Sequence, residues 1–307
     1  MASLPEFYDP DRIGTLFYPD VAAIAAQAET AGLPPAEQDS RRVMLLIVDM
    51  QIDFCHAQGM LYVPGAIGDI RRLIEFIYRN AERITRITCS LDSHHPFQIF
   101  HPAWWVDSAG RHPPPFTTIT AGDVETRRWQ PVFQPDGSRE YVRRLQREAK
   151  KQLTIWPYHV PIGGVGNALD TELWSAVFWH AVARRSPPVW WAKGGIPRTE
   201  HYSILKPEIE IAGEPQSELN QDFIHSIEEF DALVIAGEAA SHCVLETVED
   251  LVEVFRHRPD HLAKIRILTD CTSPVRHPQI DFHAIAQGRF KEFESMGVKL
   301  TTSKAPL

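Results

Sequence analysis

The sequence has little cysteine, no long apolar run and no excess of basic residues. Its 307 residues include four cysteines, too few for the disulfide framework of a small secreted protein. We therefore expect free thiols in a reducing cytoplasm. No apolar stretch approaches the roughly 20 residues that span a bilayer, and the first residues lack the basic and apolar regions of a secretory signal. The net charge of −9 argues against a nucleic-acid partner.

What is present indicates one large globular unit. Hydrophobic residues make up 44% of the chain, enough to bury a sizeable core. Residues 1–42 contain several prolines and one alanine-rich stretch, which predict an N-terminal extension with a single helix. Residues 43–307 are expected to form a single domain with an insertion at about 104–153. The insertion is rich in proline, arginine and aromatic residues, and its charged run at 143–151 predicts a solvated helix.

The rest of the domain alternates between two kinds of pattern. Short apolar runs predict strands at 43–48, 87–91, 189–192, 233–236 and 265–269. Apolar residues at helical spacing predict helices at 67–84, 169–182, 243–255 and 280–296. Strands that alternate with helices predict an α/β fold, a doubly wound and mostly parallel sheet with helices on both faces.

Reactive side chains stand at four of the predicted strand ends. Asp49, Asp92 and Lys193 each end a strand-like run, and Cys243 lies in the turn after another. Alone, each has an ordinary explanation: a turn residue, a solvated charge or a small buried side chain. Ligands of open parallel sheets bind at the carboxyl ends of the strands, so the four together predict a site.

Cys243 is the candidate nucleophile. It stands at a strand-to-helix turn, where the helix dipole is expected to favour a thiolate. Asp49 can accept the thiol proton and Lys193 can balance the two negative charges. Backbone N–H groups of the 238–243 turn can stabilise an oxyanion. His242 is not the first choice as base, since adjacent residues at a helix start do not face each other.

Four segments resemble motifs of the isochorismatase-like cysteine hydrolases, most closely the nicotinamidase branch. They are the residues 48–54 (VDMQIDF), 59–66 (GMLYVPGA), 193–205 (KGG with YSIL) and 237–244 (GEAASHCV). The resemblance implies the isochorismatase-like hydrolase fold and a catalytic triad of Asp49, Lys193 and Cys243. It also implies a cis peptide between Glu238 and Ala239, with the N–H groups of Ala239 and Cys243 as oxyanion hole. Glu238 departs from the pattern, which has an apolar residue there.

A metal site is expected beside the triad. Asp92 and His94 form an Asp-x-His pair whose side chains point the same way on an extended segment. The resemblance implies a third ligand, His159, from the run Trp156-Pro157-Tyr158-His159, 65 positions after His94. Competing histidines are His95, His101 and His112, of which His101 is the best substitute. Two histidines and a carboxylate suit a divalent ion, zinc first, with iron or manganese as alternatives.

The resemblance implies how the substrate would lie. A pyridine nitrogen would take a water position on the metal while Cys243 attacks the carboxamide. A flat ring needs apolar walls, for which Phe54 is a candidate and Trp104, Trp105 and Tyr158 are possible further ones. Simple core or surface packing is the more common role for each of these side chains taken alone.

These observations predict a nicotinamidase of NAD salvage that releases ammonia through a Cys243 thioester. One alternative is another cysteine amidase of the superfamily, acting on a carbamoyl or ureido amide, with structural histidines. The other is a binding module that keeps the fold without the reaction. The expected partner is a small amide, and the resemblance also implies a homo-oligomer.

Overall fold

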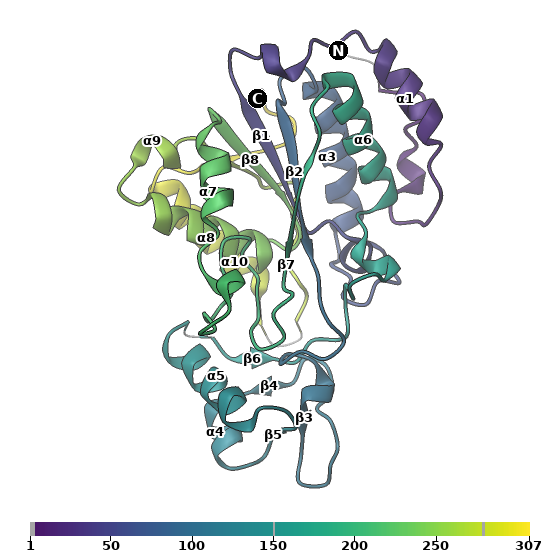
Figure 1. The fold of residues 1–307 in the computed structure, drawn as a ribbon. Coiled ribbons are helices and arrows are strands. Elements are labelled where there is room, and N and C mark those ends of the chain that lie inside the picture. The colour runs from purple at the N-terminus through teal and green to yellow at the C-terminus, as the bar shows by residue number, and fades with distance from the viewer. Residues whose placement is uncertain (1–3, 150, 278–279) are drawn as a thin grey trace.

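A parallel sheet of six strands forms the centre of the molecule (Figure 1). The computed structural model describes residues 4–149, 151–277 and 280–307. The strand order is β10-β9-β8-β1-β2-β7, and every pairing in this sheet is parallel. The strands are β1 Val43–Val48, β2 Arg86–Asp92, β7 Val189–Lys193, β8 Ala232–Gly237, β9 Ile265–Leu268 and β10 Lys299–Thr301. The predicted parallel α/β architecture is confirmed.

The central strand β1 shows why the sheet forms here. All six of its residues are buried, as an unbroken apolar run in a two-sided parallel sheet requires. Its alternate side chains enter different cores: Leu45 packs into one hydrophobic cluster and Leu46 into the other. Strands β2 and β8 flank it, with Met44 opposite Arg86 and Val43 opposite Ala232.

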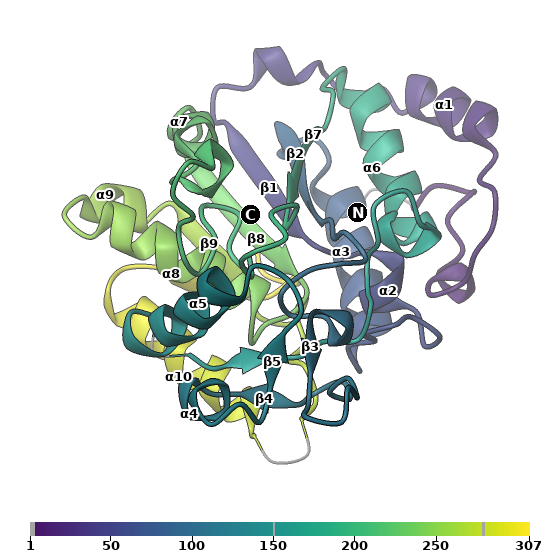
Figure 2. The ribbon, with the colours of Figure 1, turned by 60° about the horizontal axis from the view of Figure 1, so that its bottom comes forward.

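Helices cover both faces of the sheet (Figures 1 and 2). One face carries α3 Ala66–Asn80 and α6 Thr171–Arg184, with α1 Val21–Thr30 packed on α6. The other carries α7 Gln221–Glu228, α8 Cys243–Phe255, α9 Pro259–Leu262 and α10 Phe282–Ser295. The helix predicted at 243–255 is confirmed at both ends, while α3 stops at Asn80, four residues before the predicted end.

Several short elements escaped the sequence patterns. The three residues of β10 and the eight of α7 are too short to show a clear period. The four-residue helix α2 Ile52–Cys55 follows β1. Single 3₁₀ turns occupy Pro10–Arg12, Ala36–Gln38, Pro102–Trp104, Val165–Asn167 and Pro215–Ser217.

The N-terminal segment is fastened to the domain rather than loosely attached. Ile24 and Ala28 of α1 are buried in the same core as α6. Arg184, at the end of α6, is fully buried and forms an ion pair with Asp39 while donating to the carbonyl of Pro34.

The segment around the predicted insertion folds beside the carboxyl ends of the sheet strands, at the bottom of Figure 1. It contains two small antiparallel pairs, β3 Trp105–Val106 with β5 Gln130–Pro131 and β4 Thr118–Ile119 with β6 Leu153–Thr154. Its helices are α4 Ala121–Glu125 and α5 Pro135–Arg147. The helix expected at 143–151 is therefore the end of α5, which starts earlier; residue 150 lies outside the described residues.

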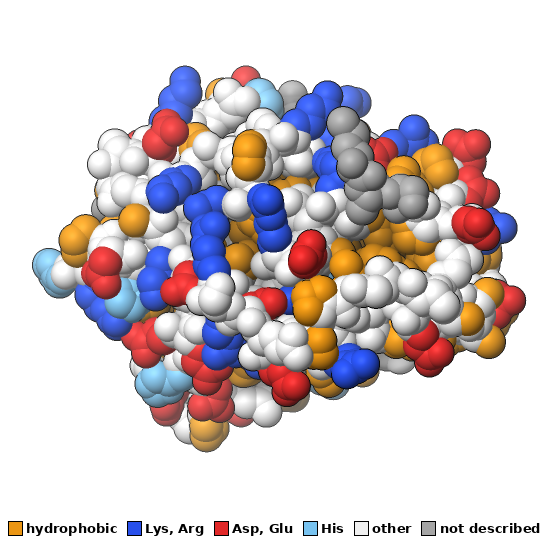
Figure 3. Space-filling view, turned by 90° about the horizontal axis from the view of Figure 1, so that it is seen from above, with side chains coloured by type: hydrophobic (Ala, Val, Ile, Leu, Met, Phe, Trp, Pro, Cys, Tyr) orange, Lys and Arg blue, Asp and Glu red, His pale blue; other side chains and the backbone are white. Residues whose placement is uncertain are grey.

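The surface carries charges of both signs. On the face seen from above, Lys and Arg side chains are interspersed with Asp and Glu (Figure 3). In the described ranges, no helix combines the length and apolar character that crossing a membrane requires.

Candidate active site

The four strand-end groups come together at one edge of the sheet. Asp49 follows β1, Asp92 ends β2, Lys193 ends β7, and Cys243 begins α8 after β8. Because β8, β1, β2 and β7 are consecutive neighbours, their carboxyl ends lie side by side. All four side chains are buried.

Lys193 is the centre of this group. Its Nζ lies 2.9 Å from Asp49 Oδ2 and 3.0 Å from Asp92 Oδ1. It also lies 3.6 Å from the Sγ of Cys243 and donates to the carbonyl of His201 at 3.0 Å. Burial alone would lower the pKa of Lys193, but Asp49 and Asp92 raise it above its usual range. Lys193 is therefore a fixed ammonium that compensates two buried carboxylates.

Cys243 is a thiol at rest, which corrects the sequence-based expectation of a thiolate. Burial raises its pKa well above the usual value, and Asp49 and Asp92 add to the rise while Lys193 opposes it. The N-terminus of α8 lies at Cys243 and favours a thiolate, but burial and the two nearby carboxylates have the larger effect on its pKa.

Hydrogen bonds with Ser90 hold the carboxyl group of Asp49 in place. Ser90 Oγ donates to its Oδ1 at 2.6 Å, and its own N–H donates to Ser90 Oγ at 3.2 Å. Burial raises the pKa of Asp49 against the pull of Lys193. A base with a raised pKa binds a proton more readily at neutral pH.

The turn before Cys243 offers donors for an oxyanion. The peptide between Glu238 and Ala239 is cis. In the described part of the chain, no acceptor takes the N–H of Ala239 or Cys243, whereas Ala240 donates to Ser273 and His242 donates to Ala239. His242 turns its Nδ1 to Ser241 Oγ at 2.8 Å, so its position gives no support to a role as base.

Glu238 is neutral and does not oppose a developing oxyanion. Its Oε2 accepts from the Ser273 N–H at 3.2 Å, and its carboxyl hydrogen-bonds Asp69. Burial and Asp69 raise the pKa of Glu238 well above its usual value. Arg72 lies 2.6 Å from Asp69 Oδ1, and the raised pKa of Glu238 assigns the proton of this carboxyl pair to Glu238.

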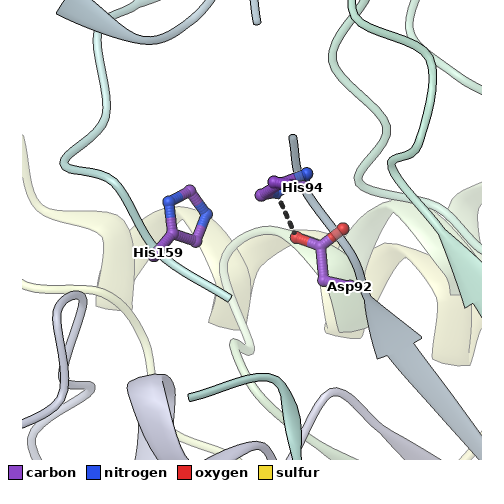
Figure 4. Close-up of side chains that lie close together, drawn as sticks. All are labelled: Asp92, His94 and His159. Carbon is purple, nitrogen blue, oxygen red and sulfur yellow. Dashed lines mark ion pairs between the residues drawn. The ribbon is translucent and has the colours of Figure 1, made fainter. Parts of the chain in front are cut away.

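Asp92, His94 and His159 form a second buried group beside the triad (Figure 4). One ligand-type atom from each lies within 4.8 Å of the others, and Asp92 Oδ2 lies 2.9 Å from His94 Nε2. Burial and the proximity of His94 lower the pKa of His159 to about 3, so its imidazole is neutral. Neutral imidazole is the form that binds metals.

Both histidines are oriented for metal binding by backbone carbonyls. His94 Nδ1 lies 3.1 Å from the carbonyl of Gly194, and His159 Nδ1 lies 2.7 Å from that of Pro157. A carbonyl only accepts, so Nδ1 of each ring carries a proton, and Nε2 is the nitrogen left for a metal. Gly194 is needed at its position, because a Cβ there would lie 2.5 Å from Asp92 Oδ1.

Main-chain hydrogen bonds bring together the segments of His94 and His159, which are far apart in the sequence. His94 N–H donates to the carbonyl of Val160 at 3.1 Å, and Ile162 N–H donates back to that of His94 at 3.0 Å. Further out, Trp156 N–H donates to the carbonyl of Phe100 at 2.8 Å. The chain thus leaves for the insertion and returns from it at adjacent points, which brings His159 to His94.

The competing histidines lie outside the group. His101 is nearest, with its ring centre 6.1 Å from that of His94 and 6.0 Å from that of His159. His112 lies 2.7 Å from the Trp105 carbonyl within the insertion, and His95 is exposed.

A small cavity of about 40 Å³ joins the two groups. Phe54 lines it, with its ring centre 5.5 Å from that of His159. The other three candidates have the ordinary packing roles: Trp104 and Trp105 belong to the core of the insertion, and Tyr158 is 41% exposed. The aromatic walls besides Phe54 are Phe100, Trp156 and Tyr202.

Sequence reasoning missed the polar residues that hold the segments carrying Asp92 and His159. Gln51 Nε2 donates to the carbonyl of Asp92 at 2.7 Å, and the Asp92 N–H donates back to Gln51 Oε1. Asp53 accepts from the Val160 N–H at 2.6 Å. Both lie in the first motif, two and four residues after Asp49, but their partners are distant in the chain.

The comparisons with known proteins rest on structure. No protein-family model and no curated protein matches the sequence. The structure is similar to that of the yeast nicotinamidase Pnc1p bound to the inhibitor nicotinaldehyde, with a TM-score of 0.56 and 17% identity over 85% of this chain and 99% of that one. The chain has the isochorismatase-like fold of the nicotinamidases.

Two further structures agree with this finding. The Acinetobacter baumanii nicotinamidase pyrazinamidase matches with a TM-score of 0.53 and 14% identity, over 87% of this chain and 98% of that chain. PnC1 from L. infantum in complex with nicotinate matches with a TM-score of 0.51 and 19% identity, over 88% and 96%.

Proposed function

We propose that this protein is a cysteine amidohydrolase that converts nicotinamide, or a closely related small amide, to the acid and ammonia. The observation that carries the proposal is the buried contact of Lys193 with Asp49, Asp92 and Cys243. A thiol, a carboxylate and a cation are in mutual contact there, beside a group suited to a metal, which supports the proposal. The fold shared with the nicotinamidases supports the same reaction class.

The first half of the reaction forms a thioester. Asp49 takes the proton of the Cys243 thiol as sulfur attacks the carboxamide carbon. The N–H groups of Ala239 and Cys243 stabilise the tetrahedral oxyanion. The C–N bond then breaks, and Asp49 returns the proton to the leaving nitrogen, so that ammonia departs.

The second half restores the thiol. Asp49 takes a proton from a water molecule as its oxygen attacks the thioester carbon. The C–S bond breaks, the acid is released, and the sulfur recovers the proton. Lys193 stays charged throughout, so the carboxylates never face each other uncompensated.

Asp92, His94 and His159 would hold a divalent ion, with zinc the first choice and iron or manganese as alternatives. The donor set fits, since both imidazoles present Nε2 and Asp92 is buried among them. A bound ion supplies an electrophilic centre with open positions for a ring nitrogen of the substrate. The chain's own contribution is to fix the three ligands through Gly194, Pro157 and Gln51.

Ammonia release tests the proposal. We expect hydrolysis of nicotinamide that disappears in Cys243→Ala and declines when a strong chelator removes the metal. A panel of carbamoyl and ureido amides, run in parallel, identifies the alternative amidase if nicotinamide is inert. A protein that hydrolyses no amide in the panel, when loaded with zinc, iron or manganese, contradicts the proposal.

The partner, the assembly and the cellular compartment also belong to this proposal. We propose a small-molecule amide as the partner and a homo-oligomer as the assembly. All four cysteines, Cys55, Cys89, Cys243 and Cys271, are free thiols, which supports the cytoplasm as the proposed compartment.

A further inference from the structure

Glu200 is a buried carboxyl group on the cavity wall that the proposed reaction does not use. It is 3% exposed and lies in the segment after β7, close to Lys193 in the chain. It lines the cavity together with Trp156, Tyr202 and His242. The rings of Trp156 and Tyr202 lie 5.4 and 5.3 Å from that of His242, so these residues make a continuous wall.

The hydrogen bonds of Glu200 occupy only one of its oxygens. Oε1 accepts from Tyr202 OH at 2.5 Å and from Trp156 Nε1 at 3.1 Å. Among the described residues none donates to Oε2, and Oε2 is not one of the fully enclosed atoms without a partner. Since Glu200 lines the cavity and Oε1 is occupied, Oε2 is the oxygen left for a further hydrogen bond.

The other carboxyl groups of the cavity are already engaged. Asp92 pairs with Lys193 and His94, and Glu238 is turned to Asp69 and Ser273. Glu200 is therefore the carboxyl of the described cavity lining that remains for substrate recognition.

The occupied oxygen decides where a proton on Glu200 must lie. Oε1 uses both lone pairs for Tyr202 and Trp156, so the proton of the neutral acid is on Oε2. We propose that Glu200 is a specificity residue that presents an Oε2–H donor to the cavity and selects small amides carrying an additional hydrogen-bond acceptor, such as a carbonyl. This inference rests on the proposed amidase function and names the substrate class within it.

The surroundings of Glu200 favour the neutral acid at physiological pH. Burial raises its pKa to about 8, with Glu208 adding to the rise, while the hydrogen bonds from Tyr202 and Trp156 and the charge of Lys151 lower it. The Glu200 N–H donates to Tyr141 OH at 2.9 Å. His242 and the neighbouring His201 are neutral, because burial lowers the pKa of each to about 3.

Lys151 does not act as a counter-ion for Glu200. Its Nζ lies 2.6 Å from Glu208 and 2.7 Å from Glu246, so its charge is already balanced by two carboxyl groups. The nearest cation is thus committed elsewhere, and Glu200 is left without an ion pair in the described structure.

The test compares KM for ring-substituted pyridine carboxamides in the wild type and in Glu200→Gln and Glu200→Leu. We expect an acetyl substituent to be preferred over an amino or methyl substituent of the same ring position. In the wild type, KM for the acetyl compound should rise about tenfold between pH 7 and pH 9, as the protonated fraction falls. Glu200→Gln, which keeps an acceptor for Tyr202 and Trp156 and a permanent donor on the cavity side, should abolish this rise, and Glu200→Leu should lose the acetyl preference. Glu253→Gln, at an exposed position on α8, is the matched control.

Two results would overturn the inference: an amino substituent preferred over acetyl, or a KM profile with the same pH dependence in the wild type and Glu200→Gln. A second measurement does not need turnover. Infrared spectra of the wild type minus Glu200→Gln should show a carboxylic-acid C=O band that disappears above about pH 8, and the absence of this band contradicts the inference. If no amide is hydrolysed, the proposed function fails alone, and the inference is then decided by whether Cys243→Ala binds the acetyl compound more tightly than the amino compound.

Discussion

Lys193 Nζ lies 2.9 Å from Asp49 Oδ2, and both side chains are almost completely shielded from solvent. Removing one partner of a buried ion pair destabilises the fold strongly, because the other charge is left buried without compensation. Here the cation serves two carboxylates, because Asp92 Oδ1 lies 3.0 Å from the same nitrogen.

Lys193→Met should therefore destabilise the fold as well as the site. We expect a loss of about 3–5 kcal/mol in the free energy of unfolding, measured by urea denaturation. The matched control is Lys206→Met, which breaks the half-exposed pair with Asp250 at 3.1 Å; its cost should stay within about 1 kcal/mol. Equal losses in the two variants would contradict a special role for the buried pair.

Gly194→Ala should impair metal binding. The backbone of Gly194 has a φ of +83°, and a Cβ would lie 2.5 Å from Asp92 Oδ1 and 2.6 Å from His94 Cε1. Either ligand would have to move. We expect a loss of metal affinity of at least about tenfold, the lower end of what displaced supporting contacts cost, measured by competition with a chelator.

The neighbouring glycine provides the control for that experiment. An added Cβ at Gly195 meets no heavy atom within 4 Å. Gly195→Ala should bind metal as the wild type does, and a similar defect in both variants would show that the steric argument is wrong.

His159→Ala should reduce metal affinity more than His101→Ala. The ligand atoms of Asp92, His94 and His159 lie within 4.8 Å of one another, whereas the ring of His101 stands beside the group. Metal content after dialysis, with thermal stability as a check on folding, measures the difference. The reverse order would place the third ligand at His101.

Glu238→Gln should change the pH dependence of stability. The pKa of Glu238 is raised in the folded state, so its contribution to stability is complete below the ordinary glutamate pKa and is lost as pH rises toward the folded value. We expect the wild type to lose up to about 1.4 kcal/mol per pH unit in that window relative to Glu238→Gln. Urea denaturation at pH 5 and pH 8 measures this.

Glu253→Gln on the exposed side of α8 serves as the comparison for Glu238. Its unfolding free energy should follow that of the wild type at both pH values. If Glu238→Gln also does so, Glu238 is ionised in the folded protein and the proton-sharing with Asp69 is wrong.

The strand ends could be predicted from the sequence because their signals are local. An unbroken apolar run followed by a reactive residue identified Asp49, Asp92 and Lys193, and the parallel order of the strands then brought them together. The neutral state of Glu238 could not be foreseen, because it depends on Asp69 at the start of α3, a contact that no sequence spacing encodes.

The aromatic walls show a second limit. Trp104 and Trp105 were possible walls for a flat ligand as well as ordinary core residues, and composition could not decide between the two roles. Both pack in the separate core of the insertion, because a segment of this size needs a core of its own. Trp156 instead faces the cavity because its N–H bonds the Phe100 carbonyl on the way back to the sheet. The thiol state of Cys243 was also missed, since burial and two carboxylates from other strands outweigh the local helix end.

Main-chain hydrogen bonds of His94 with Val160 and Ile162, and of Trp156 with Phe100, hold the two ends of the insertion together beside the cavity. The relative positions of His94 and His159 therefore depend on these hydrogen bonds and not on the length of the loop between them. We expect a loop of another length or sequence, joined at the same points, to leave the positions of Asp92, His94 and His159 unchanged.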